Sequence, residues 1–305
     1  MTLAGRLPTI QTMAFLALNK EKISAYVALT KPRILLMVLI MSAAGFFMGA
    51  GGSLRPLDNF LIMLLGTALS SGGAAALNNY LERESDQLMH RTRKRPIPAG
   101  QITADEALSF GLQLVLMGVT ILAWQVNLLT GFLSLLTVFL YVLVYTPLKR
   151  VTWWNTVIGA IPGALPPVGG WTAVTGHLDY GAWIVFLILF VWQHPHFYAI
   201  AWMYKDDYER GGFKMLPVVH PDGRSTFNQV VGFSIILIPI SLLPALVGMA
   251  GPFYAWGMGI LGLVMLAIGV QFSRTRSVQD AKRLLKASII YLPLFFALIL
   301  GDSSF

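Results

Sequence analysis

Hydrophobic positions along this chain gather into long runs without a charged residue, separated by short polar segments. A helix that crosses a bilayer needs about 20 mostly apolar residues, so the runs indicate membrane-spanning helices. They cover residues 34–54, 59–81, 107–148, 151–178, 180–204, 225–273 and 287–301. The third and sixth runs are long enough for two helices each, with turns expected near 127–131 and 248–252. The pattern therefore predicts nine transmembrane helices, the last of them short, in an all-α polytopic membrane protein.

The composition supports this interpretation. Of the 305 residues, 56% are hydrophobic and 12% are charged, and the mean hydropathy is +0.67. Soluble domains carry about 25% charged residues. Half that share cannot cover a water-facing surface, which excludes a soluble globular enzyme, a disordered chain and a fibrous protein. The sequence has no cysteine, which excludes disulfides, zinc–thiolate sites and thiol nucleophiles.

The net charge of +8 would suggest a nucleic-acid partner in a soluble protein, but its distribution here points elsewhere. With nine spans, alternate connections lie on opposite sides of the membrane, and every Lys and Arg except Arg55 then falls on one side. The positive-inside rule places this side in the cytoplasm. We therefore expect the bases to set the topology, with membrane lipid around the chain and no nucleic-acid partner. Most acids share the basic side, and only Asp58, Asp179 and Asp302 lie opposite.

The first 30 residues are expected to precede the membrane domain as an arm. Their apolar stretch at 10–18 is too short to span a bilayer, and no convincing cleavage site follows it. We interpret residues 1–30 as a cytoplasmic or interfacial arm and residues 31–305 as a single transmembrane domain. Because no transit peptide is evident, the sequence favours a bacterial inner (plasma) membrane over a mitochondrion.

The first of two acidic clusters lies at the cytoplasmic end of the second predicted span. Asn78, Glu82 and Asp86 are spaced i, i+4, i+8, so they line one stripe of a helix. Oxygen ligands on one stripe suit Mg²⁺, which also bridges to phosphate oxygens. The basic run 91–95 follows at once. A solvated helix end that fixes topology is the plainer explanation, but the stripe begins inside an apolar span, which favours a metal–phosphate site.

The second acidic cluster follows the sixth span and holds Asp206 and Asp207 between basic neighbours. It is expected on the same side of the membrane and at the same depth as the first cluster. Two facing carboxylate clusters beside Arg and Lys side chains would clamp a diphosphate with Mg²⁺. Taken alone, however, such acids are more often ordinary loop residues than metal ligands.

Two further pairs of residues carry candidate chemistry. Tyr145 and Lys149, at i and i+4 of the fourth span, could face a diphosphate or could be an interfacial Tyr and a snorkelling Lys. His194 and His196 lie inside the sixth span, where an ionisable group suggests function but a lone His is also often a hydrogen-bonded residue between helices. Two residues apart on a helix, they point in nearly opposite directions and cannot readily bind one metal together.

The fifth span contains several Gly and Pro residues and is expected to be kinked. The kinks could make room for a flat or long ligand. Close packing of helices through small residues is an equally good explanation.

These motifs resemble those of the UbiA-type intramembrane prenyltransferases. The segment from Asn78 to Asp86, with Met89 to Pro96 after it, is similar to the first signature of that family. Other matching stretches are Lys31-Pro32-Arg33, Tyr145-Thr146-Pro147-Leu148-Lys149-Arg150, Trp192-Gln193-His194-Pro195-His196-Phe197, and Asp206-Asp207-Tyr208 leading to Met215-Leu216-Pro217. They run from about residue 30 to residue 300. The Trp-Gln-x-Pro-His-Phe stretch resembles the branch that farnesylates protohaem IX, in which His196 takes the His position of the motif and His194 a variable one.

The resemblance implies a nine-helix fold, Mg²⁺ as the cofactor, and a reaction between farnesyl diphosphate and a vinyl group of protohaem IX (haem B). With addition of water, this reaction gives haem O and diphosphate. It also implies haem-modifying enzymes as possible partners. The implied metal ligands are Asn78, Glu82, Asp86, Asp206 and Asp207. The implied diphosphate-binding residues are Arg91, Arg95, Tyr145 and Lys149, and His196 with His194 would face the haem. Of these residues, Asn78, Glu82, Asp86, Lys149 and His196 are the expected catalytic set.

The sequence departs from the family pattern in two places. Glu82 and Glu84 stand where members usually have Asp, which keeps the charge but adds a methylene. The second acidic motif of other members, two Asp one helical turn apart, is not matched by the adjacent Asp206 and Asp207, so how a second metal is held stays open.

Three other functions compete with this interpretation. One is a related prenyltransferase that acts on a quinone precursor or chlorophyllide, against which the Trp-Gln-x-Pro-His-Phe stretch argues. Another is a membrane transporter, but transporters place binding charges near mid-membrane. Here nearly all acids lie at helix ends. The third is a haem-binding assembly factor without catalytic activity.

Overall fold

The computed structural model describes residues 10–302, with side chains from residue 20 onward. Within this part of the chain, nine helices are long and apolar enough to cross a membrane, so the prediction of an all-α polytopic membrane protein is confirmed. Seven of them are α2 (Pro32–Gly49), α3 (Leu57–Leu88), α7 (Asn155–Thr175), α8 (Tyr180–Met203), α11 (Arg224–Leu246), α12 (Pro252–Thr275) and α13 (Val278–Gly301). The other two spans, Ala104–Val126 and Leu128–Leu148, begin with α4 (Ala104–Ile121) and α5 (Leu128–Val138).

The remaining helical segments extend or connect these nine. Helix α4 continues as a π-helix through Leu122–Val126. Helix α5 continues through a second π-helical stretch, Phe139–Tyr145, into the short helix α6 (Thr146–Leu148). Three further helices lie at the ends of the spans, namely α1 (Ile10–Leu29), α9 (Lys205–Arg210) and α10 (Leu216–Val219). The first nine residues of the expected N-terminal arm lie outside the described residues.

Helix boundaries differ from the expected spans where helices carry charges beyond the apolar run. The last span was expected to be short, and this is wrong, because α13 begins at Val278 and has 24 residues. Its first turn is capped by the Ser277 hydroxyl, which accepts the backbone N–H of Asp280. Likewise α3 continues to Leu88 through the whole acidic stripe. The breaks at Asn127 and between Leu246 and Pro252 fall where turns were expected.

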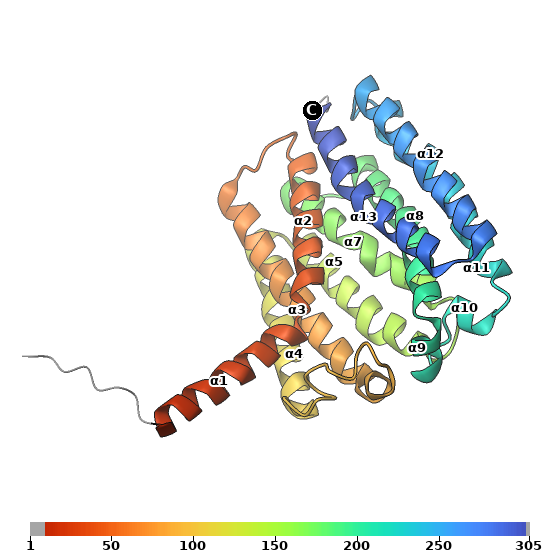
Figure 1. Ribbon diagram of the computed structural model, residues 1–305. Coiled ribbons are helices and arrows are strands. Elements are labelled where there is room, and N and C mark those ends of the chain that lie inside the picture. The colour runs from red at the N-terminus through yellow and green to blue at the C-terminus, as the bar shows by residue number, and fades with distance from the viewer. Residues whose placement is uncertain (1–9, 303–305) are drawn as a thin grey trace, which may run out of the picture.

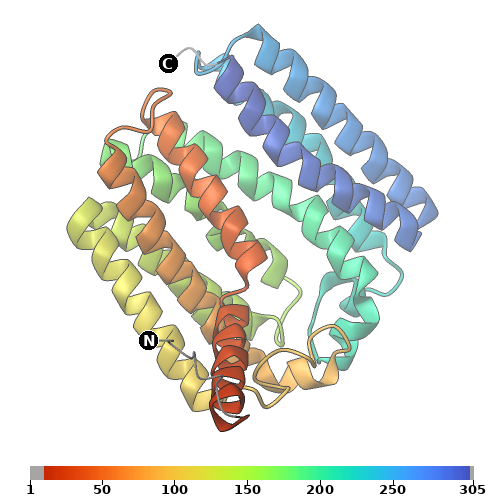
Figure 2. The same cartoon turned by 60° about the vertical axis from the view of Figure 1, so that its left-hand side comes forward.

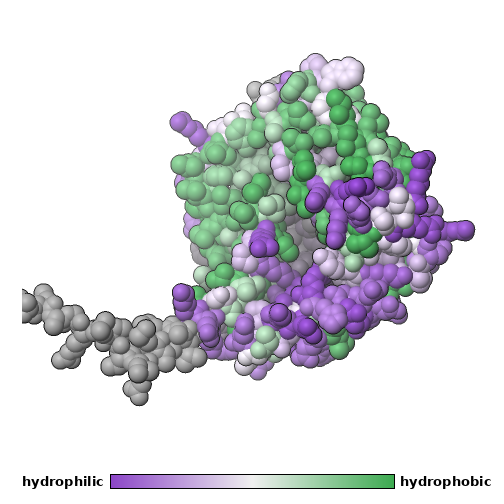
Figure 3. Space-filling model, viewed as in Figure 1, coloured by the Kyte–Doolittle hydropathy of each residue, from purple (hydrophilic) through white to green (hydrophobic). Residues whose placement is uncertain are grey.

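Figures 1 and 2 show the long helices running side by side in one bundle. The connection between α3 and α4, together with α9 and α10, gathers at one end of the bundle, from which α1 also departs. We call this the charged end. In Figure 3, hydrophilic residues concentrate there, whereas the sides of the helices are largely hydrophobic. This surface is typical of a protein embedded in lipid along its sides.

Small residues let α2 and α7 approach so closely that backbone touches backbone. A Cβ on Gly170 would lie 1.9 Å from the carbonyl oxygen of Ser42, and one on Gly45 would lie 1.9 Å from that of Pro167. The Ser42 hydroxyl also donates to the Pro166 carbonyl at 3.1 Å, which adds a side-chain hydrogen bond between the two helices. Of the two explanations for the Gly and Pro residues in this span, the structure therefore supports close helix packing at these positions.

We expect Gly170→Ala to destabilise the bundle by about 1–3 kcal/mol, because the added methyl group collides with backbone that cannot move aside. Gly169→Ala is the matched control, since a Cβ on Gly169 has no atom within 4 Å. Thermal unfolding in detergent measures both. Equal unfolding temperatures for the two variants would contradict the close contact between α2 and α7.

Candidate functional site

The predicted stripe on α3 is present and is buried. Asn78, Glu82 and Asp86 have 1%, 5% and 0% of their surface exposed, whereas Glu84 on the other side of the same turn is exposed. All three lie in one continuous helix, in which a spacing of four residues keeps side chains on one face. The plainer explanation, a solvated helix end, therefore does not fit this face of α3.

Two of the predicted diphosphate-binding cations converge on these carboxylates. The ammonium group of Lys149 lies 2.7 Å from Glu82 Oε1. Arg95 Nη1 lies 2.9 Å and 2.7 Å from the two carboxylate oxygens of Asp86, and 3.8 Å from Glu82 Oε2. A buried carboxylate is costly without such partners. The loop after α3 and the end of α6 are thus tied to the stripe by charge.

A third cation, Lys31, reaches the same group and was not among the predicted site residues. Its ammonium group donates to Asn78 Oδ1 at 2.5 Å, while Asn78 Nδ2 donates to the Thr146 hydroxyl at 2.9 Å. Burial, reinforced by the positive charge of Arg95, lowers the pKa of Lys31 to about 7. The sequence offered one hint, because Lys31 belongs to the Lys31-Pro32-Arg33 stretch that matches the family. Nothing in the local sequence indicates that its side chain points toward Asn78.

Tyr145 lies beside Lys149, as predicted from their spacing. The Lys149 ammonium group is 4.5 Å from the centre of the Tyr145 ring, within reach of a cation–π interaction. The ring fits there because Gly159 has no side chain, since a Cβ at that position would lie 2.5 Å from the ring. Burial alone would lower the pKa of Lys149, but the charge and hydrogen bond of Glu82 together with the nearby Tyr145 and Tyr141 outweigh it and raise the pKa above its usual value. Lys149 therefore stays charged.

The second acidic cluster touches the loop that follows the first. The Asp207 carboxylate accepts the backbone N–H groups of His90 and Arg91 at 3.1 Å and 3.2 Å, and it pairs with Arg210. Partial burial raises the pKa of Asp207, but these hydrogen bonds outweigh it and hold the pKa below its usual value. Asp206 is exposed. These contacts give Asp207 a structural role in positioning the loop, and the metal-binding role of the pair stays a prediction.

Arg91 lies at the outer edge of this arrangement. Its guanidinium group sits 4.7 Å from the centre of the Tyr204 ring and donates to the Tyr208 hydroxyl at 3.3 Å. It is exposed and is held against aromatic rings rather than against a carboxylate. The structure therefore places Arg91 next to the loop but separates it from the group formed by Arg95 and Lys149.

The donor atoms on the stripe are of the kind that Mg²⁺ prefers. Glu82 and Asp86 offer carboxylate oxygens and Asn78 offers its amide oxygen, and all three side chains are buried. Among the described residues, no group of three or more His, Cys, Asp or Glu side chains could hold a metal by itself. A magnesium ion here would therefore be held by two carboxylates and one amide oxygen, together with ligands that the substrate or water provides.

The two histidines of α8 face different neighbours, as their spacing predicted. The ring of His194 stacks on Phe233 of α11 with 3.7 Å between ring centres, and its Nδ1 contacts the Phe190 carbonyl at 2.7 Å. His196 instead turns to α13, where its Nδ1 lies 2.8 Å from the Ser288 hydroxyl. Because His194 is completely buried and His196 is partly accessible, the structure favours His196 as the one that a ligand can reach.

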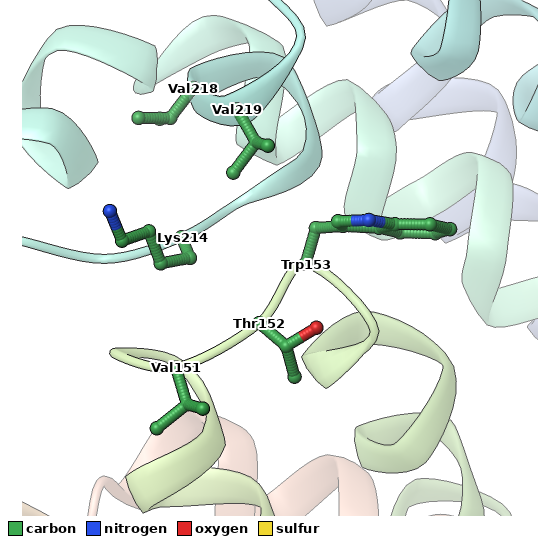
Figure 4. A pocket seen from close by; sticks show the side chains of 6 residues that line it. All are labelled: Val151, Thr152, Trp153, Lys214, Val218 and Val219. Carbon is green, nitrogen blue, oxygen red and sulfur yellow. The ribbon is translucent and has the colours of Figure 1, made fainter.

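A cavity of about 440 Å³ opens beside this site at the charged end. Figure 4 shows Val151, Thr152 and Trp153 on one connection, with Lys214, Val218 and Val219 on the facing segment. The two segments are joined where the Lys214 backbone N–H donates to the Lys149 carbonyl at 2.6 Å. The residues that line the cavity include none of the predicted site residues.

Known proteins resemble this chain in sequence over most of its length. The relative from Solibacter usitatus named protoheme IX farnesyltransferase is 47% identical over 285 residues, which cover 91% of this chain and 98% of the relative. The relative of the same name from Salinibacter ruber is 48% identical over 277 residues, with 91% and 98% coverage.

Solved structures of other proteins have a fold similar to that of this chain. The structure described as digeranylgeranylglyceryl phosphate synthase has a TM-score of 0.78 at 15% identity and covers 92% of this chain and 98% of its own. The structure of a UbiA homolog from Archaeoglobus fulgidus bound to GPP and Mg²⁺ has a TM-score of 0.65 at 18% identity, with 90% and 99% coverage. Residues 38–299 match the UbiA prenyltransferase family, and the chain belongs to that family.

Proposed function

We propose that this protein transfers the farnesyl group of farnesyl diphosphate to a vinyl group of protohaem IX, with addition of water, to give haem O and diphosphate. The observation that carries the proposal is the buried group at the charged end, in which Lys31, Arg95 and Lys149 meet the stripe on α3. The relatives named protoheme IX farnesyltransferase, at 47% and 48% identity, support the choice of substrates.

The three cations would bind the diphosphate. Arg95 and Lys149 balance the two carboxylates that they contact, and Lys31, which is bonded to the neutral amide of Asn78, adds positive charge for an arriving anion when it is protonated. Asn78, Glu82 and Asp86 would hold a magnesium ion, which would supply positive charge to neutralise the leaving diphosphate. The UbiA homolog from Archaeoglobus fulgidus is described as bound to GPP and Mg²⁺, which supports this use of a metal. Arg91 and Tyr145 would border the same site.

The bond-making steps need a site that excludes bulk water. The bond between the farnesyl carbon and the diphosphate oxygen breaks, and its electron pair leaves with the diphosphate. The vinyl group then supplies the electrons of the new carbon–carbon bond, and water captures the cation that forms beside the porphyrin. Burial of the α3 stripe strengthens the electrostatic contacts with the leaving group. His196 would lie on the haem side of the site, with His194 behind it.

The competing functions fit the structure less well. A prenyltransferase for a quinone precursor or chlorophyllide shares the diphosphate site, but the relatives in this identity range carry the haem name. A transporter would place its charges near the middle of the membrane, whereas here they lie at one end of the bundle. A haem-binding assembly factor has no need for three cations around an acidic stripe.

The chain is a multi-pass membrane protein, and we propose the bacterial inner membrane as its location. The spans alternate so that the charged end carries nearly all basic residues, which supports placing this end and α1 in the cytoplasm. Residues 31–305 would then act as one transmembrane domain, preceded by a cytoplasmic arm. Haem-modifying enzymes that take up haem O are the expected partners.

The decisive assay incubates the purified protein with haem B, farnesyl diphosphate and Mg²⁺, and measures both haem O by mass spectrometry and released diphosphate. We expect both products, and we expect a chelator to remove activity until Mg²⁺ is added back in excess. Neither product under several detergent or lipid conditions would overturn the proposal. Turnover that persists fully in the chelator would overturn the metal assignment alone.

We expect Asp86→Asn to lower turnover by at least about 100-fold, because the amide is a poorer metal ligand and Arg95 loses its nearer counter-ion. Glu84→Gln is the matched control, since Glu84 is exposed on the same helical turn. Thermal unfolding checks that both variants retain the fold. Wild-type turnover in Asp86→Asn would contradict the role of the stripe.

Lys31→Met should weaken the use of farnesyl diphosphate by about 10- to 100-fold in kcat/KM, the range for losing a hydrogen bond to a charged group. Methionine keeps much of the length and apolar volume of the lysine. Arg33→Met removes a positive charge from an exposed position two residues away and should leave kcat/KM close to wild type. If the two variants behaved alike, Lys31 would have no place in the diphosphate site.

A further inference from the structure

A hydrogen-bonded contact joins α8 to α13 next to the candidate haem-facing histidine. Ser288 on α13 is completely buried and contacts α8 twice. Its hydroxyl oxygen lies 2.8 Å from His196 Nδ1, and its carbonyl accepts the indole N–H of Trp192 at 3.0 Å. Trp192 and His196 are one helical turn apart, and their rings stack with centres 5.1 Å apart. The hydrogen bond to Ser288 and the stacking on Trp192 therefore fix the orientation of the His196 ring.

The contacts of Ser288 also determine which nitrogen of His196 carries the proton. The Ser288 hydroxyl lies 2.7 Å from the Leu285 carbonyl, and a carbonyl oxygen can only accept a hydrogen bond. The Ser288 hydroxyl therefore donates its only hydrogen to the Leu285 carbonyl. In the contact with His196, the hydroxyl oxygen must accept, and the Nδ1–H group of His196 donates. A neutral imidazole protonated at Nδ1 has a free lone pair at Nε2.

His194 shows that this arrangement differs from an ordinary buried histidine. Its Nδ1 also faces a carbonyl, that of Phe190, so its Nε2 is likewise unprotonated in the neutral ring. That Nε2, however, is sealed in the interior without a partner. The Nε2 of His196 is not among the buried atoms without a partner in the described part of the chain, and the residue is partly accessible. His196 therefore presents an available acceptor.

His196 also lies at a suitable depth for the reaction. It precedes the end of α8 at Met203 by seven residues, or about 10 Å of helix. Glu82 precedes the end of α3 at Leu88 by six residues, or about 9 Å. Both helices end at the charged end, where Asp207, just after α8, contacts the loop that follows α3. The histidine and the acidic stripe thus lie in the same layer of the bundle.

We propose that Ser288 is a positioning residue that holds His196 Nε2 ready to accept a proton from the water that captures the cation. In this step a lone pair of the water oxygen forms the carbon–oxygen bond, one O–H bond breaks with its electrons kept by oxygen, and the proton moves to Nε2. The hydroxyl group of the product results. This inference rests on the proposed function and assigns a role within it.

The product itself reports on this step. If no base assists the attack of water, the cation loses a proton from the neighbouring carbon and gives an alkene that is lighter than haem O by one water. The experiment therefore measures, for each full-length variant with haem B, farnesyl diphosphate and Mg²⁺, both the released diphosphate and the ratio of hydroxylated to dehydrated product. Diphosphate release tests the ionisation step, and the ratio tests the capture by water.

We expect Ser288→Ala to lower the ratio of hydroxylated to dehydrated product several-fold while diphosphate release stays within about twofold of wild type. His196→Gln, which removes the base itself, should lower the ratio by at least about tenfold. Ser288→Thr keeps the hydroxyl and should restore the wild-type ratio. Ser234→Ala is the matched control, because this buried serine bonds only the Val230 carbonyl of its own helix.

Three results would overturn the inference. One is a wild-type ratio in both His196→Gln and Ser288→Ala. Another is a fall in diphosphate release that parallels the loss of hydroxylated product, which would make Ser288 only structural. The third is a changed absorption spectrum of bound haem in His196→Gln with an unchanged ratio, which would make His196 an iron ligand. If the wild-type protein released no diphosphate at all, the proposed function itself would fail, and this inference would fail with it.

Discussion

The rest of the site depends on how the two buried carboxylates of α3 are compensated. Removing Glu82 and Asp86 from water costs several kcal/mol each unless opposite charges and hydrogen bonds are supplied. Lys149 and Arg95 supply them at 2.7 Å each. Both cations come from connections between helices rather than from α3 itself. The need to compensate these charges therefore determines where those connections must lie.

Close packing elsewhere makes these ion pairs possible. Lys149 follows the π-helical stretch and lies against Tyr145, whose ring occupies the space left open by Gly159 of α7. Further along its length, α7 packs backbone to backbone against α2 through Gly170. Since Lys31 stands directly before α2, the same packing brings the third cation to Asn78. Small residues in the membrane thus position the charges at the end of the bundle.

Much of the site was predictable, and the exceptions share one cause. The stripe of Asn78, Glu82 and Asp86 follows from helical periodicity, and its start inside an apolar run favoured a binding site over a solvated helix end. Arg95 and Lys149 were expected near it because the family resemblance implies that both bind the same diphosphate. Lys31 was missed, and Asp207 was found on backbone N–H groups of a loop 116 residues and more away. Such contacts depend on how distant segments approach each other, and periodicity carries no information about that.

The hydrophobic pattern by itself determined the number of spans, their alternation and the side on which the charges gather. It could do so because the choice between water and hydrocarbon is made locally, within about 20 residues at a time. Tertiary structure alone decided which partner each buried charge takes and which nitrogen of His196 is left free. Those outcomes depend on pairs such as His196 and Ser288, which are 92 residues apart and meet only when α8 packs against α13.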